Sequence, residues 1–239
     1  MKFATPLQEA RLIKRYKRFL ADVVLADGST TTLHCPNTGS MLNCAAPGSR
    51  VWYSVAENAA RKYPFTWEQV EVDGGHRVGI NTGRANTLVK EALQNDVIPA
   101  LRGYAMLQSE VAYGSEGSRV DFLLSGGGEE PLPSCYLEVK SVTLGLGDGL
   151  GAFPDAVTAR GLKHLRELVA MRESGQRAVL LFCVQHTGID TVVPADRIDP
   201  VYGRALREAR AAGVEVMAWG CDIGSQEIIL RRELPVQMP

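Results

Sequence analysis

The stretch that decides the fold is Arg119-Val120-Asp121-Phe122-Leu123-Leu124, followed after a loop by Tyr136-Leu137-Glu138-Val139-Lys140-Ser141. Both runs are short and mainly apolar, which is typical of buried β-strands. Side chains alternate between the two faces of a strand, so Glu138 and Lys140 are predicted to share one face. If the two strands are neighbours, Asp121 can lie beside Glu138. The pattern therefore places two carboxylates and an ammonium group within one sheet.

Charged side chains are rare in apolar strands unless they are paired or bind a metal ion. Carboxylate and carbonyl oxygens are the ligands that Mg²⁺ and Mn²⁺ prefer. We therefore expect Asp121, Glu138 and the backbone carbonyl of Val139 to hold one such cation, which would polarise a phosphodiester and acidify a water molecule. Lys140 is expected to stabilise the negative charge that develops on the phosphate. The alternative is an ordinary salt bridge between Glu138 and Lys140 on a solvated strand face.

The composition is that of an ordinary globular protein. The chain has 239 residues, of which 45% are hydrophobic and 22% charged, and its formal net charge is −1. This balance excludes a uniformly basic nucleic-acid coat and an acidic disordered tail. No apolar run is long enough for a membrane span, and residues 1–20 carry charges throughout, unlike a secretory signal. The five widely spaced cysteines predict reduced thiols, so we expect a cytoplasmic protein without a membrane partner.

Residues 1–82 are predicted to form a small β-barrel. Strand patterns separated by turn residues cover 19–25, 30–34, 50–54, 66–72 and 76–80. This number of short strands fits an oligonucleotide/oligosaccharide-binding (OB) barrel, and an SH3-like barrel fits the pattern almost as well. Residues 83–239 follow the order helix, three strands, helix, strand, helix, strand. That order predicts an α/β domain with a mixed sheet.

A basic segment in the barrel is the main candidate for contact with DNA. Its cations are Arg11, Lys14, Arg15, Lys17 and Arg18. Cations interleaved with aromatic rings suit a groove that follows a phosphate backbone and stacks bases, and we expect contact with DNA here. The alternative is a solvated edge strand that its charges protect from aggregation.

A second candidate lies on the helix predicted over 156–173. Arg160, Lys163 and His164 share one face of this helix and are expected to reach a phosphate if the helix packs near the metal site. An exposed face with helix ion pairs is the alternative. The glycine-rich stretch 145–151 lacks the Lys-Ser/Thr ending of a phosphate loop, so we expect a mobile loop there.

These motifs together resemble a known family. Asp121 followed by Glu138-Val139-Lys140 in this order of elements resembles the PD-(D/E)XK nuclease-like superfamily. More specifically, the chain resembles the sugar fermentation stimulation protein A family over nearly its full length. The matching stretches are 15–19, 34–41, 81–82, 118–122, 138–144, 153–161, 163–168, 199–200 and 213–215.

The resemblance implies an OB-like DNA-binding domain over 1–82 and a nuclease-like domain over 83–239. It also implies a catalytic set filled by Asp121, Glu138 and Lys140. A further acidic residue often lies on the first helix of this superfamily, and Glu91 is the candidate here, with Asp96 left open.

The implied function is sequence-nonspecific DNA binding with a regulatory role in the expression of sugar-utilisation genes of the maltose type. The alternative is an active Mg²⁺- or Mn²⁺-dependent nuclease, and an oligosaccharide-binding barrel is a third hypothesis. We expect a cytoplasmic, nucleoid-associated protein whose partner is DNA, and leave open whether it is a homodimer.

Overall fold

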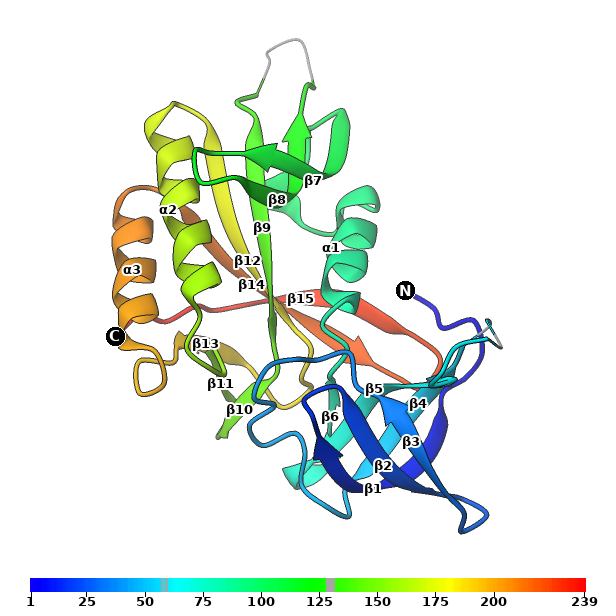
Figure 1. Cartoon of the computed structure of the whole chain (residues 1–239). Coiled ribbons are helices and arrows are strands. Elements are labelled where there is room, and N and C mark those ends of the chain that lie inside the picture. Colours follow the sequence, from blue (N-terminus) through cyan, green and yellow to red (C-terminus); the bar gives the residue numbers. More distant parts are fainter. Residues whose placement is uncertain (57, 59, 128–131) are drawn as a thin grey trace.

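The computed structural model describes residues 1–56, 58, 60–127 and 132–239, and its first part is a β-barrel (Figure 1). The barrel strands are β1 (Gln8–Tyr16), β2 (Leu20–Leu25), β3 (Thr30–His34), β4 (Arg50–Val55), β5 (Phe65–Val72) and β6 (His76–Gly79). Strands β1 to β5 run in the order β3-β2-β1-β4-β5, and a pairing between His34 and Thr66 joins β3 to β5. Inward side chains such as Leu12, Val51 and Trp67 fill the interior. The predicted OB-like barrel is confirmed.

The second part is a mixed α/β domain, as expected. Its elements are α1 (Arg84–Gln94), a 3-10 turn (Pro99–Leu101), β7 (Met106–Tyr113), β8 (Ser118–Ser125), β9 (Cys135–Val142), β10 (Leu144–Gly147), β11 (Leu150–Phe153), α2 (Ala159–Glu173), β12 (Arg177–Val184), β13 (Thr191–Pro194), α3 (Pro200–Ala211), β14 (Glu215–Ile223) and β15 (Ile228–Leu234). The main sheet has the order β15-β14-β12-β9-β8-β7, and a small sheet has the order β10-β11-β13.

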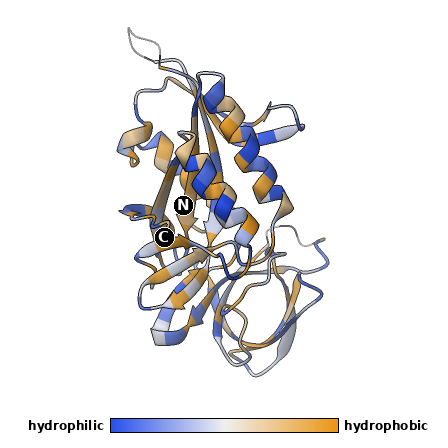
Figure 2. Ribbon diagram, turned by 90° about the vertical axis from the view of Figure 1, so that its left-hand side faces the viewer, coloured by the Kyte–Doolittle hydropathy of each residue, from blue (hydrophilic) through white to orange (hydrophobic). Residues whose placement is uncertain are grey.

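The main sheet is covered on both faces. Helix α1 packs on one face, over a cluster that includes Leu137 and Leu181, while α2 and α3 pack on the other, over Leu180 and Phe182. Alternate residues of β12 therefore belong to opposite core clusters, as strand geometry requires. The helices carry hydrophobic and hydrophilic residues side by side (Figure 2), which fits elements with one packed and one solvated face.

Two local predictions were wrong. The alternative of an edge strand for the basic segment does not hold, because β1 lies between β2 and β4. This strand has an irregularity between Leu12 and Lys14 and ends at Tyr16. The stretch 145–151 is not an irregular loop but contributes to the β10–β11 hairpin, which gains an edge partner in β13. The positive φ angles of Gly147 and Gly149 suit the turn of this hairpin, so the glycines serve local geometry.

Backbone hydrogen bonds fasten the barrel to the α/β domain. The Gly79 N–H donates to the Gln185 carbonyl at 2.9 Å, and the Thr187 N–H donates to the Arg77 carbonyl at 3.0 Å. Near the N-terminus, the Leu7 N–H donates to the carbonyl of Ser225 at 2.9 Å. These bonds hold the two domains in one relative position.

All five cysteines are free thiols and buried. In the part of the chain that the structure describes, no helix is long and apolar enough to cross a membrane.

Candidate metal centre and nucleic-acid interface

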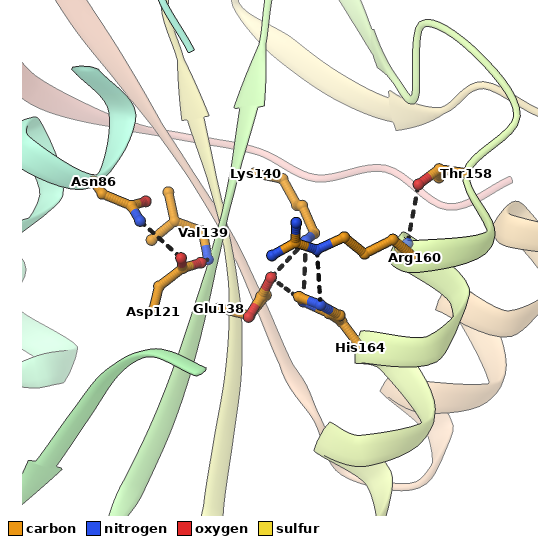
Figure 3. Close-up of polar contacts among 9 residues, drawn as sticks. Asn86, Asp121, Glu138, Val139, Lys140, Thr158, Arg160 and His164 are labelled. Carbon is orange, nitrogen blue, oxygen red and sulfur yellow. Dashed lines mark hydrogen bonds and ion pairs between the residues drawn. The ribbon is translucent and has the colours of Figure 1, made fainter. Parts of the chain in front are cut away.

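The candidate metal centre lies where β8 and β9 separate. Their antiparallel pairing runs from Leu124–Cys135 to Phe122–Leu137. At the next position the side chain of Asp121 enters the gap, and its Oδ2 accepts a 2.7 Å hydrogen bond from the backbone N–H of Val139 (Figure 3). The N–H and C=O of one strand residue point to the same side, so the Val139 carbonyl faces this gap as well.

Asp121 has a second partner on α1. Asn86 lies in the first turn of this helix, and its Nδ2 donates to Asp121 Oδ1 at 2.7 Å. The carboxylate is thereby fixed by one backbone and one side-chain donor. Burial raises the pKa of Asp121, and the negative charge of nearby Glu138 raises it further, against the opposing effect of both hydrogen bonds.

Glu138 points toward α2, where it meets two nitrogen groups. Lys140 Nζ donates to Glu138 Oε1 at 2.6 Å, which confirms that these side chains share a face. His164 Nδ1 contacts the same oxygen, and Arg160 Nε donates to His164 Nε2 at 3.3 Å. A carboxylate can only accept, so His164 Nδ1 is the donor in its contact with Glu138. The chain of contacts runs from Arg160 through His164 to Glu138 (Figure 3).

The environment of Glu138 keeps it ionised. Burial alone would raise its pKa, but the hydrogen bonds and charges of His164 and Lys140 together outweigh burial and leave the pKa below its usual value. Its second oxygen, Oε2, is buried and has no hydrogen-bond partner among the described residues. An ionised, buried oxygen without a partner is costly, so Oε2 is suited to a ligand that the chain itself does not supply.

The donor atoms of this centre suit a divalent cation. Asp121 and Glu138 repel each other electrostatically, and a cation between them would remove that repulsion. The described residues contain no group of three or more His, Cys, Asp or Glu side chains suited to a metal. The remaining ligands would therefore be the Val139 carbonyl and water, which suits Mg²⁺ because it retains several waters in proteins. The residues present fit a hard divalent cation.

A cavity of about 260 Å³ lies beside this centre. Asn86, Val139 and Lys140 line one side of it, and the barrel loop 37–39 lines the other. Asp121 and Glu138 do not line the cavity themselves, but each bonds to residues that do. Asn86 and Val139 donate to Asp121, and Lys140 donates to Glu138. The cavity is thus built by both domains.

The predicted extra acid on the first helix does not join this centre. Glu91 lies five residues after Asn86, roughly 140° further around the helix, and pairs with the amino group of Met1. Asp96 lies beyond the C-terminal end of α1, and its carbonyl accepts hydrogen bonds from Arg102. The helix instead presents the amide of Asn86 to Asp121. Sequence reasoning missed Asn86, because an amide in a helix carries no distinctive signal.

The three α2 residues that were expected to contact DNA differ from one another in burial and in their hydrogen-bond partners. His164 is only 4% exposed and bonds to Glu138, so it lies beside the candidate metal centre, and the alternative of an exposed helix face does not hold for this residue. Lys163 donates to the carbonyl of Glu116 in the β7–β8 turn. Arg160 is exposed while its Nε contacts His164. This face of α2 lies over β9, and two residues on it, His164 and Glu167, are buried.

Two arginines of the basic segment, Arg11 and Arg15, donate hydrogen bonds to backbone carbonyls. Arg15 donates to the carbonyls of Asn37 and Gly39, both at 2.8 Å, and also to those of Ser40 and Arg18. Arg11 donates to the carbonyl of Gly48 at 3.2 Å. These arginines therefore organise neighbouring backbone.

Lys14, Lys17 and Arg18 are exposed, and we call these three residues the basic turn. Lys17 and Arg18 have φ angles of 49° and 64°, which are unfavourable for residues with a side chain. Phe19 follows them and is 45% exposed. Two cations and an aromatic ring are thus displayed at the end of the β1–β2 hairpin, next to the Arg15-anchored loop.

Comparison with known proteins extends over the whole chain. The model of the SfsA N-terminal OB domain matches residues 13–80, and that of the sugar fermentation stimulation protein RE domain matches 83–227. Sugar fermentation stimulation protein homologs from Shewanella loihica and Teredinibacter turnerae are 55% and 56% identical, and the matches cover 100% and 99% of both chains. The structure of Pyrococcus furiosus SfsA in complex with Ca²⁺ matches with a TM-score of 0.86 at 26% identity, over 99% of this chain and 98% of that one. The chain therefore belongs to the sugar fermentation stimulation protein family.

Proposed function

We propose that this protein binds DNA without sequence preference and that its α/β domain is a divalent-metal phosphodiesterase. The observation that carries the proposal is the buried Oε2 of Glu138, which lacks a partner within the described ranges and lies near a second carboxylate, Asp121. The solved relative from Pyrococcus furiosus, which is in complex with Ca²⁺, supports a cation in this family.

The residues of the centre have distinct roles in this proposal. Asp121 and Glu138 hold the cation, with the Val139 carbonyl as a third ligand. A bound Mg²⁺ or Mn²⁺ would polarise the phosphodiester and acidify a water molecule. Lys140 lines the cavity and lies 2.6 Å from Glu138, so it can release that carboxylate to the cation and stabilise charge on the phosphate. His164 fixes Oε1 and thereby the direction of Oε2.

DNA binding rests on the barrel and the basic turn. OB barrels commonly bind oligonucleotides, and exposed cations contact phosphates irrespective of sequence. Lys17 and Arg18 of the basic turn have positive φ angles, which strain the backbone locally. Strained residues often cluster at binding sites. The curated relatives are named for stimulation of sugar fermentation, so we propose that DNA binding serves the expression of sugar-utilisation genes.

The experiment is a cleavage screen with the full-length chain. Labelled single-stranded, duplex and branched DNA are incubated with Mg²⁺, with Mn²⁺ or with EDTA. We expect metal-dependent cleavage of at least one substrate, and its loss in Glu138→Gln, which keeps the shape of the side chain but removes its charge. Glu233→Gln, an exposed position on β15, is the matched control and should cleave like the wild type.

Two results would count against the proposal. Intact DNA with both metals would refute the phosphodiesterase, and equal cleavage by Glu138→Gln and Glu233→Gln would show that this centre is not responsible. DNA binding is measured separately by fluorescence anisotropy, so that a DNA-binding protein without cleavage is recognised.

A further inference from the structure

We propose that the metal centre acts on an unpaired nucleotide of a DNA strand and excludes paired bases, because the barrel loop 37–39 closes over it. This inference rests on the proposed function and adds the substrate class. It starts from the cavity of about 260 Å³ between this loop and the strand that carries Val139 and Lys140. A substrate phosphate that approaches Lys140 through this cavity must pass the loop.

The loop is anchored from two sides. On the barrel side, Arg15 Nη2 donates to the carbonyls of Asn37 and Gly39 at 2.8 Å each. On the other side, the Asp155 carboxylate accepts from the Met41 N–H at 3.0 Å and from Ser40 Oγ at 3.1 Å. Such a network of charge-assisted hydrogen bonds fixes the backbone of the loop.

The loop 37–39 also lies very close to the α/β domain. A Cβ added to Gly39 would lie 2.9 Å from Asp155 Oδ2, so a larger residue at this position would displace the Asp155 carboxylate that anchors the loop. Thr82 adds a 3.0 Å hydrogen bond from its Oγ1 to the carbonyl of Pro36. A backbone hydrogen bond from Gly79 to Gln185 also joins the two domains and opposes a rotation that would widen the cavity.

The size of the cavity limits what can enter. Ligand pockets commonly have volumes of roughly 300–1,000 Å³, and this cavity of about 260 Å³ is smaller, so it has room for at most a group of about one nucleotide. Paired bases are held within a stacked duplex, whose major groove alone is about 12 Å wide. Enzymes that must enclose a single nucleotide act on single strands or extrude that nucleotide from the duplex. The exposed ring of Phe19 and the basic turn offer a path for such a strand beside the loop.

The test compares one labelled oligonucleotide sequence in three forms, with Mn²⁺ and the full-length chain. The forms are the single strand, the blunt duplex, and the duplex with a single-stranded overhang. We expect the single strand to be cut at least about tenfold faster than the blunt duplex, because a paired base must first be extruded. Cleavage of the third form should be confined to the overhang.

The loop is then tested by Asp155→Ala, which removes its anchor on the α/β domain. The preference for the single strand should fall at least about threefold as the loop becomes free to open. Asp222→Ala, which removes an exposed carboxylate from β14, is the control and should keep the preference. If Asp155→Ala does not fold, Thr38→Trp serves instead, since an indole at this exposed cavity position should block cleavage of every form.

The outcomes separate this inference from the proposed function. Equal cleavage of duplex and single strand that still requires Glu138 would overturn the inference and leave the phosphodiesterase standing. An unchanged preference in folded Asp155→Ala, or full activity in Thr38→Trp, would also overturn it. Absence of cleavage on all three forms would overturn the inference, and absence of cleavage on the branched substrate as well, with both metals, would refute the phosphodiesterase.

Discussion

The candidate metal centre and the basic turn differ in how far their charged groups are exposed to water. In the metal centre, Glu138 is 2% exposed, and its Oε2 lacks a hydrogen-bond partner within the described residues. In the basic turn, Lys14 is 64% exposed, and its contact with Asp22 is a loose 3.8 Å. A buried charge without a partner is expensive, whereas an exposed charge is stabilised by water and screened by salt.

This difference indicates two kinds of recognition. A costly buried arrangement persists only if a specific ligand or reaction benefits from it, which is why the centre is assigned to a cation. The exposed cations cost little and can attract any polyanion at a distance, which is why they are assigned to nonspecific contact with phosphates. The predictions below test each assignment.

The largest expected effect is a loss of affinity for Mn²⁺ when Glu138 is no longer held in position by His164. His164→Ala removes the imidazole that contacts Oε1, and we expect the affinity for Mn²⁺ to fall about 10- to 100-fold, as is usual when a partner of a metal ligand is lost. Isothermal titration calorimetry measures this affinity, and His164→Asn, which retains a hydrogen-bond donor, should lose less. Wild-type affinity in a folded His164→Ala protein would contradict the role given to His164.

A smaller effect is expected at the basic turn. Replacing Lys14, Lys17 and Arg18 by Gln should reduce the slope of log affinity for DNA against log salt by up to about 3, since each lost phosphate contact removes about 0.9. Arg15 is left in place because it anchors the loop. The control replaces exposed Arg204, Arg210 and Arg231 by Gln, with the same change in net charge. An identical decrease in both proteins would indicate a general charge effect and no interface at the turn.

The smallest effect is on the pH dependence of cation binding. The pKa of Asp121 is raised above 3.8, so its proton competes with the cation over a wider pH range than usual. Affinity for Mn²⁺ should therefore increase as the pH rises above 3.8, by at most about tenfold per pH unit, because the lowered pKa of Glu138 keeps that group ionised. The same series on Asp121→Asn should lose this increase. A steeper or unchanged dependence in the variant would exclude Asp121 as its origin.

For Asp121, the pH dependence of folding stability has the opposite sign to the pH dependence of cation binding. The folded state holds the Asp121 proton more tightly than the unfolded chain, so ionisation of this group lowers stability as the pH rises from 3.8 to the raised pKa. Glu138 acts in the other direction, because its lowered pKa stabilises the fold above 4.5, and this contribution is lost as the pH falls.

Strand alternation was sufficient to predict much of the centre. It placed Glu138 and Lys140 on one face. It placed Asp121 beside Glu138 on the condition that the two strands are neighbours, which the structure meets. It could not predict that β8 and β9 separate at Asp121, because the separation depends on the Asn86 and Val139 donors that capture the carboxylate.

The remaining errors share a physical cause. The sequence left open whether the Arg160–His164 face of α2 is exposed or lies near the metal site. His164 is buried because Glu138 of β9 provides a partner inside the fold. Arg15 looked like a DNA ligand, but carbonyls of a loop distant in sequence take up its donors. Strand β13, with four residues, gave no periodic signal. Each of these depends on tertiary partners that local sequence patterns do not contain.

The central claim is that Asp121 and Glu138 share one divalent cation. The most direct measurement is a crystal structure of the full-length chain soaked with Mn²⁺, with anomalous scattering used to locate the metal. We expect a manganese peak in contact with both carboxylates, with Oε2 of Glu138 as a ligand. Manganese bound elsewhere, or a Glu138 that remains bonded only to Lys140 and His164 at saturating Mn²⁺, would contradict it.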